Sequence, residues 1–196
     1  MRTEPRRFNI SDLVREFNEG KITLPLMQRD FVWRPRKARA LFESLCMGYP
    51  IGSFYLWKSV KPQLTKQGHR PGSLLLLDGQ QRLTSLIRGI APEGGADQAY
   101  RAYLDLINDS IVMGEETVTV KKRIAANDPT LIALSEIISI KEQSEVERLK
   151  VVQNILQGLR DENIIRKEHA GRAMNYQARV AAKSKLFERT VPCEEV

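Results

Sequence analysis

The stretch LLLLDGQQRLTSL, residues 74–86, decides the fold class of this chain. Four successive leucines make an apolar run of strand length, and such a run needs burial on both faces. Asp78 and Gly79 then turn the chain. Leucine and isoleucine recur at helical spacing from Leu83 to Ile90, which indicates a helix packed on that strand. A strand, a turn and a helix in this order predict a mixed α/β (α+β) fold.

Two helices and two extended segments are expected before this stretch. Ser11 has the side chain of a helix N-cap, and a first helix should run from it towards Gly20. Pro35 suits the first residue of a second helix. Residues 22–25 and 54–57 are expected to be extended, since the first segment leads into a proline and the second is rich in aromatic residues. The second helix has apolar residues at helical spacing, namely Ala38, Leu41, Phe42, Leu45 and Tyr49.

Three β-rich segments follow the predicted 83–90 helix. Residues 101–106 and 110–113 predict a hairpin that turns at Asn108-Asp109. Residues 117–120 read Thr-Val-Thr-Val, and their β-branched side chains predict a further strand. We therefore expect a sheet to continue beyond the helix.

The C-terminal part is expected to be helical from Pro129 onward, with an amphipathic helix over residues 146–159. Residues 189–196 have the composition of a strand that is starting. These patterns predict two parts. Residues 1–125 would form a mixed sheet with flanking helices, and residues 126–196 a C-terminal helical extension that stops before its natural end.

The composition is that of an ordinary globular domain and excludes several classes of protein. Hydrophobic residues make up 42% of the 196 residues and charged residues 28%. No run approaches the roughly 20 apolar residues that a membrane span needs. Cys46, Cys193, His69 and His169 match no disulfide or zinc spacing. We therefore expect a cytoplasmic protein in a reducing compartment, with no membrane contact.

The charge is basic and concentrated near the N-terminus. The formal net charge is +7, and residues 1–60 carry 11 Lys/Arg against 6 Asp/Glu. Such an excess favours polyanionic partners. Two interpretations stay open from the sequence: a solvated basic face, or a surface that contacts phosphate.

The segment Asp78-Gly79-Gln80-Gln81-Arg82 carries the clearest chemistry, because it places polar groups at a helix N-terminus, which suits phosphate. Gly79 lets the backbone approach a ligand, and Arg82 can grip a phosphate. Asp78 can hold hydrated Mg²⁺, and Gln80 or Gln81 can orient a water molecule. The alternative is structural: Asp78 caps the helix, Gly79 permits the turn, and the glutamines are helix formers on a wet face. The Walker and dinucleotide-binding patterns are both missing.

A second polar element, Gln28-Arg29-Asp30, precedes Phe31 and Trp33. Arg29 can reach the same pocket if this extended piece lies beside the strand that ends at Asp78. The alternative is that Arg29 and Asp30 form a surface pair of little energetic value. Phe31 and Trp33 are expected to lie in the core.

Three segments taken together resemble the N-terminal domain of GmrSD-type, modification-dependent restriction enzymes, which belongs to the ParB/sulfiredoxin-like superfamily. They are LPLMQRDFVW at residues 24–33, GYPIG at residues 48–52 and DGQQR at residues 78–82. Their order and separations also fit ParB, which has a Gln-Pro-Arg element, a Gly-x-x-x-Pro-Ile turn and a Gly-Glu-Arg-Arg box. The resemblance is clear from Phe8 to Leu106.

The resemblance implies a ParB/sulfiredoxin-like mixed sheet that binds a nucleoside triphosphate together with Mg²⁺. ParB has a glutamate where this chain has Gln80, and a glutamine cannot act as a general base. Hydrolysis would therefore depend on a positioned water and on electrostatics. The cysteine and histidine of sulfiredoxin are missing from the turn, which excludes its thiol chemistry. The implied roles are catalytic for Asp78, Gln80 and Gln81, metal-binding for Asp78, and nucleotide-binding for Gln28, Arg29, Gly79 and Arg82.

The expected function is that of a triphosphate-binding and hydrolysing sensor or regulatory module in a DNA restriction or anti-phage defence system. The expected partners are a nucleoside triphosphate, the DNA backbone, and a C-terminal nuclease domain or partner chain, since nothing in this sequence matches a His-Asn-His nuclease. A homodimer is left open. The alternative is a non-catalytic DNA-binding or protein-interaction module of the same fold.

Overall fold

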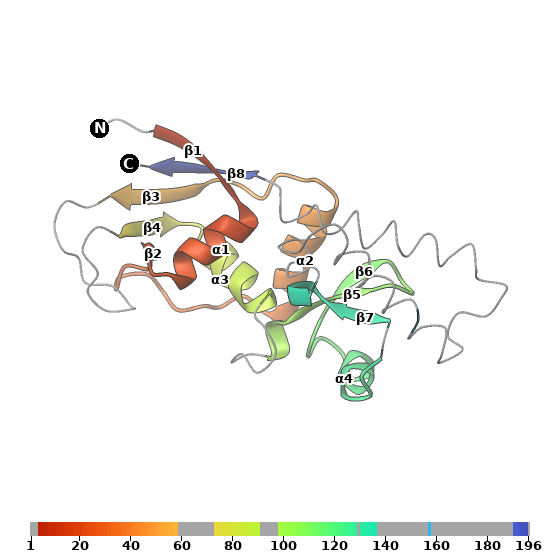
Figure 1. Ribbon diagram of the computed structural model, residues 1–196. Helices are drawn as coiled ribbons and strands as arrows, with labels where there is room; N and C mark the ends of the chain where they lie inside the picture. The colour runs from red at the N-terminus through yellow and green to blue at the C-terminus, as the bar shows by residue number, and fades with distance from the viewer. Residues whose placement is uncertain are drawn as a thin grey trace.

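The computed structural model describes residues 4–58, 73–90, 98–128, 130–136, 157 and 190–195 (Figure 1). The strands of the larger sheet are β1 (Glu4–Asn9), β2 (Ile22–Thr23), β3 (Phe54–Lys58), β4 (Leu74–Asp78) and β8 (Thr190–Glu195). The smaller sheet contains β5 (Ala102–Asp105), β6 (Ser110–Met113) and β7 (Leu131–Ala133). The helices are α1 (Ile10–Asn18), α2 (Pro35–Cys46), α3 (Gln80–Gly89), α4 (Val118–Ala125) and the short 3-10 helix η1 (Gln98–Tyr100).

The larger sheet has the order β1-β8-β3-β4-β2 and mixes both strand directions. β8 pairs antiparallel with β1 and parallel with β3, so a strand from the far end of the chain lies between two N-terminal ones. β4 pairs antiparallel with β3 and parallel with β2. Figure 1 shows β1 and β8 side by side at the same end of the molecule. The C-terminal segment therefore completes the N-terminal sheet.

The smaller sheet is antiparallel and has β5 at its centre. β5 and β6 form the predicted hairpin, with Asp105 opposite Ser110 and a positive φ of 48° at Asp109. β7 pairs with the other edge of β5. α2 packs against both α3 and β6, so it joins the two sheets through one hydrophobic core (Figure 1).

The mixed α/β fold predicted from the sequence is confirmed. β3, β4, α2 and the β5–β6 hairpin occur where the patterns place them, and Pro35 is the first residue of α2. Residues 190–195 form a strand, as their composition predicts. None of the helices among the described residues is long and apolar enough to cross a membrane.

Several boundaries differ from the prediction. α1 begins at Ile10 with Asn9 as its N-cap, so Ser11 lies inside the helix and does not cap it. Tyr49 lies beyond the end of α2 and is 60% exposed, because the helix stops at Cys46. The strand was predicted to be buried on both faces. Leu74, Leu75 and Leu76 are buried, but Leu77 is 41% exposed.

Two predictions of secondary structure type are wrong. Residues 118–120 belong to α4 and not to a strand, because Thr117 Oγ1 accepts a hydrogen bond from Val120 N at 3.1 Å and caps that helix. Residues 131–133 form β7 and not a helix, since they pair with the free edge of β5. In both cases a specific contact overrides a weak local propensity.

The predicted amphipathic helix over residues 146–159 lies outside the described residues, apart from Gln157. The division of the chain near residue 125 stays a prediction. β8, however, comes from the segment assigned to the extension and pairs within the larger sheet. Cys46 is half-buried and Cys193 is buried, and neither forms a disulfide within the described residues.

A partly buried ion-pair network joins the smaller sheet to α4. Arg123 donates from Nη1 to Asp105 Oδ2 and from Nε to Asp128 Oδ2, both at 2.6 Å. Arg123 Nη2 also donates to Thr130 Oγ1 at 2.8 Å. Burial acts to raise the pKa of Asp105 and of Asp128, but hydrogen bonds from Arg123 and from neighbouring groups outweigh it, so both pKa values lie below the ordinary range.

This network predicts a loss of stability in acid. The charged carboxylates favour the folded state, so the stabilisation is complete above the unfolded pKa of about 4 and disappears as pH falls through the lower folded pKa. The free energy of unfolding, measured by urea denaturation from about pH 6 to pH 2, should therefore fall. Asp128→Asn should flatten this dependence, because it removes one of the two carboxylates that pair with Arg123. An unchanged slope in Asp128→Asn would contradict the assignment.

Gly89 sets the distance between α3 and α2. A Cβ at this position would overlap the ring of Phe42, which is fully buried. Helix propensity alone predicts that Gly89→Ala stabilises the protein by up to about 1 kcal/mol. Overpacking predicts the opposite sign, a loss of about 1 to 3 kcal/mol. We expect the loss in chemical denaturation, with Thr84→Ala on the same helix as a control close to zero.

Candidate functional site

The candidate site begins where β4 ends and α3 starts. Asp78 is the last residue of β4, and Gly79 is the N-cap of α3 with a φ of +96°. A Cβ at Gly79 would lie 2.5 Å from Phe54 Cδ1, so this position needs glycine for its backbone conformation and for space. Asp78 is therefore not the cap that the structural alternative supposed.

Gln81 holds the segment between β2 and α2 against α3. Its Oε1 accepts hydrogen bonds from Val32 N at 2.9 Å and from Trp33 N at 3.3 Å. Its Nε2 donates to Asp30 O at 3.0 Å. The side-chain carboxamide is thus used on both sides by the backbone of residues 30–33.

Two more glutamines strengthen the same contact. Gln80 Nε2 donates to Arg29 O at 2.7 Å, and Gln28 Nε2 donates to Leu77 O at 2.8 Å. Gln80 and Gln81 are only 6% and 8% exposed. The alternative interpretation, in which these two glutamines are helix formers on a solvent-exposed face, is therefore wrong. Residues 28–30 do lie beside the end of β4. This is the arrangement under which Arg29 was expected to come near the turn.

Arg82 connects the turn to the GYPIG segment. Its Nη1 donates to Ile51 O at 2.8 Å, and its Nη2 forms an ion pair with Asp78 Oδ2 at 3.0 Å. The guanidinium lies 4.9 Å from the centre of the Phe54 ring. A Cβ at Gly52, whose φ is +84°, would lie 2.5 Å from Arg82 Nη1. Arg82 thus occupies a tight space between two glycines.

The third segment, residues 78–82, therefore holds the other two by hydrogen bonds to residues 29–33 and to Ile51. Sequence reasoning named the segments but missed the carbonyls of Leu77 and Ile51 as their partners. It also missed Tyr100, whose hydroxyl donates to Trp33 O at 2.6 Å. The sequence holds no direct signal for these acceptors, because every residue has a carbonyl.

Three kinds of group stay available at the turn. The side chain of Asp78 is 67% exposed, and its Oδ1 makes no bond within the described part of the chain. No backbone acceptor among the described residues takes the N–H groups of Gln80, Gln81 or Arg82 at the first turn of α3. Gln80 Oε1 is likewise unused there. The turn thus offers a carboxylate, helix N–H donors and a carboxamide oxygen.

The side chain of Arg29 lies on the other side of the same segment. It lines a groove of about 620 Å³ with Val32, Trp33, Arg34, Arg36 and Lys37, which we call the basic groove. Phe31 and Trp33 are only half-buried: Phe31 packs edge-on against Tyr100 at 5.1 Å between ring centres, and Trp33 packs against the core. The backbone of this segment faces α3, and its cationic side chains face outward.

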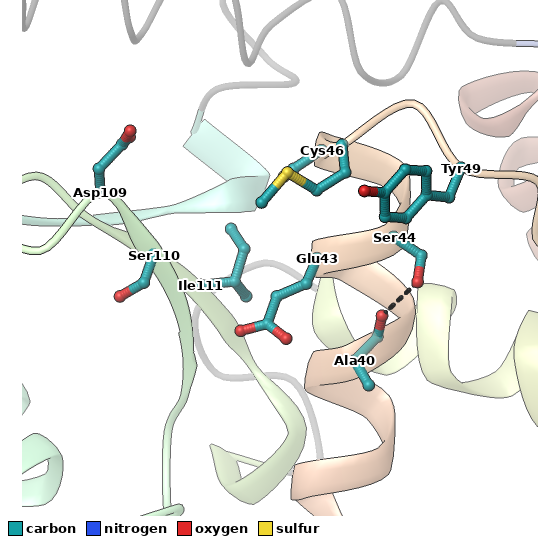
Figure 2. Close-up of a pocket in the computed structure, with 9 residues that line it drawn as sticks. Ala40, Glu43, Ser44, Cys46, Tyr49, Asp109, Ser110 and Ile111 are labelled. Atoms are coloured by element: carbon teal, nitrogen blue, oxygen red, sulfur yellow. Dashed lines mark hydrogen bonds between the residues drawn. The ribbon is translucent and has the colours of Figure 1, made fainter.

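A separate cavity of about 470 Å³ lies between the C-terminal half of α2 and the β5–β6 hairpin (Figure 2). Glu43 and Ser44 line it from the helix, and Asp109, Ser110 and Ile111 from the hairpin, with Tyr49 at its rim. None of the residues predicted for the site lines this cavity.

A comparison with known protein families finds a match over most of the chain. The model of the "GmrSD restriction endonuclease, N-terminal domain" matches residues 10–190. The chain belongs to this family. An uncharacterized protein of Methanocaldococcus jannaschii is 32% identical over 119 residues, which are 50% of this chain and 20% of that protein. The match covers about a fifth of the length of that relative.

The contacts of Gln81 predict a structural role that can be measured. Gln81→Met keeps the length of the side chain but removes partners from two N–H groups and one carbonyl in the half-buried 30–33 segment. The free energy of unfolding should fall by about 2 kcal/mol, since unsatisfied polar groups cost more than a bond is worth. Thr84→Ala, one turn later on α3, serves as the control. An equal effect in both variants would contradict this role.

Proposed function

We propose that this domain binds a nucleoside triphosphate with Mg²⁺ and hydrolyses it, as the sensor or regulatory module of a DNA restriction system. The single observation that carries the proposal is the turn at residues 78–82. It brings together an exposed carboxylate, an arginine and helix N–H groups that no backbone acceptor among the described residues takes. The side chain of Gln28 and the backbone carbonyl of Arg29 lie beside them. Family membership supports the restriction context.

The phosphate groups of the nucleotide would lie at the N-terminus of α3. The helix dipole is positive there, and backbone N–H groups without partners stabilise a negative charge. Arg82 uses two of its N–H groups, for Ile51 O and Asp78, which leaves others of its five for phosphate oxygens. Gly79 keeps the approach to the backbone open, because it has no side chain.

Asp78 fits the part of a magnesium ligand. Mg²⁺ is usually held by one or two carboxylates together with phosphate oxygens and water. Among the described residues no group of three or more acidic, histidine or cysteine side chains could hold a metal ion, so the nucleotide itself would have to supply most of the oxygen ligands. Bound there, the ion would neutralise phosphate charge. Asp78 Oδ1 is the oxygen left free for it by the ion pair with Arg82.

The two glutamines take different parts in this proposal. The Gln81 carboxamide forms hydrogen bonds with the backbone of residues 30–33, and its part is to position that segment. Gln80 Oε1 accepts no bond from the described part of the chain, so Gln80 is the better candidate to orient the attacking water. Because a carboxamide cannot accept the proton as a general base, hydrolysis should be slow. DNA cleavage is assigned to a nuclease domain or partner chain that this module regulates.

The test is the thermal stability of the chain with GTP, ATP, CTP and UTP, each with and without Mg²⁺. A triphosphate at a hundredfold excess over its Kd should add about 2.7 kcal/mol to the stability of the folded state. Asp78→Asn should lose the part that depends on Mg²⁺, and Asp109→Asn, which changes an exposed acid in the hairpin, should keep it. Arg82→Ala should lose the shift altogether, measured from the variant's own melting temperature.

Release of inorganic phosphate then separates hydrolysis from binding. A shift with one triphosphate and slow Mg²⁺-dependent release, absent in Asp78→Asn, would support the proposal. Binding without release would leave a nucleotide sensor and refute the hydrolytic part. No shift with any triphosphate would refute the site.

The second candidate is a non-catalytic binding module of the same fold. The observation in its favour is that Gln81 uses both ends of its carboxamide inside the protein and Gln28 uses its Nε2 there, so the arrangement of the turn does not need a ligand. This candidate expects no melting shift with any triphosphate and no phosphate release, together with binding to DNA or to another protein.

A further inference from the structure

The N-terminus of α2 has the wrong charge for its own stability. Arg34 is the N-cap, Pro35 is the first helical residue, and Arg36 and Lys37 follow in the first turn, where no acidic residue occurs. The N-terminus of a helix is the positive end of its dipole, so acidic side chains stabilise it and basic ones destabilise it. A local arrangement that costs stability without an evident gain is typical of a functional site.

The basic groove gathers these charges on one surface. Its lining contains Arg29, Arg34, Arg36 and Lys37 and no acidic residue. Within the described part of the chain, Arg29, Arg34 and Arg36 take part in no ion pair. Three arginines without an ion pair among the described residues, together with Lys37, create a local positive potential, which attracts a polyanion.

The backbone that carries these side chains is held in place. Hydrogen bonds from Gln80 and Gln81 reach residues 29–33, and Tyr100 donates to Trp33 O. The cationic side chains therefore project from a fixed segment. A surface whose backbone is fixed before binding loses less entropy when a partner docks.

The groove suits a phosphate backbone better than it suits bases. Lys37 Nζ lies 4.6 Å from the centre of the Trp33 ring and covers one of its faces, and Trp33 is partly buried against the core. A base could stack on that face of Trp33, as single-strand binding would need, only by displacing Lys37. Separate cations on an open groove match the repeated charges of a duplex.

We propose that the basic groove, the outward face of residues 29–37, is a docking surface for the phosphate backbone of duplex DNA. The DNA partner follows from membership of a restriction-endonuclease family together with the charge of the groove. The proposal does not rest on the nucleotide site, because Arg34 and Arg36 have no part in it. Binding is sequence-tolerant and sensitive to salt.

The experiment measures binding of the 196-residue chain to a labelled duplex of mixed sequence by fluorescence anisotropy, at several salt concentrations. The test variant is Arg34→Gln with Arg36→Gln, which removes two side chains that make no hydrogen bond or ion pair within the described residues. The matched control is Lys121→Gln with Lys122→Gln, which removes the same charge from exposed residues of α4.

The test variant should bind about tenfold more weakly or worse, and the slope of log affinity against log salt should fall by about 0.9 for each phosphate that the protein no longer neutralises. The control should stay within about twofold of the parent. The melting temperature of the test variant should stay level or rise, because the substitutions remove two positive charges from the positive end of the α2 dipole. Weak binding together with a clearly lower melting temperature would overturn the proposal, since it would indicate damage to the fold.

Other outcomes identify a different occupant. Equal losses in the test variant and the control would mean that only net charge matters, and would refute the groove. Preference for a single strand of the same length would refute the duplex. Equal competition by polyglutamate would indicate an acidic protein partner. Loss of the triphosphate-induced melting shift in the test variant, with DNA binding intact, would assign the groove to nucleotide phosphates instead. Each of these four results overturns the proposal.

Discussion

The hydrogen bonds of the Gln81 carboxamide are the interaction on which the rest of this structure depends. Residues 29–34 belong to no helix or strand, so their backbone groups lack the partners that regular structure provides. Gln81 supplies three of those partners from the first turn of α3, and Gln80 supplies a fourth. A buried polar side chain such as that of Gln81 costs stability unless it is hydrogen-bonded, and here its hydrogen bonds join the segment to the helix.

This attachment places two different surfaces on one short segment. The backbone of residues 29–33 faces the turn at residues 78–82, where the nucleotide is proposed to bind. The side chains of Arg29, Arg34 and Arg36 face outward into the basic groove. Arg82 adds a second attachment, because it reaches Ile51 O while it pairs with Asp78. The space for that guanidinium exists because residues 52 and 79 are glycines. Three segments that are distant in the sequence thereby become one site.

The polar motifs were the part of the site that could be predicted from the sequence. Residues 28–33, 48–52 and 78–82 are short, polar and ordered along the chain, and the structure brings them together. Their individual roles were less visible. A glutamine at the start of a helix has the same sequence signature whether it faces water or bonds to a neighbouring loop, so burial had to distinguish the two. The partners of these side chains are backbone carbonyls and N–H groups, which every residue carries.

By itself, the sequence determined the periodic elements: α2 after Pro35, the leucine strand β4, the turn at Gly79 and the β5–β6 hairpin. These depend on local spacing and turn chemistry, which neighbouring residues decide. Tertiary structure alone decided that residues 131–133 form a strand, that β8 inserts between β1 and β3, and that the glutamines of α3 hold residues 29–33. Each of these depends on a partner far away in the chain, and a one-dimensional pattern contains no record of which distant edge or backbone group will be free to pair.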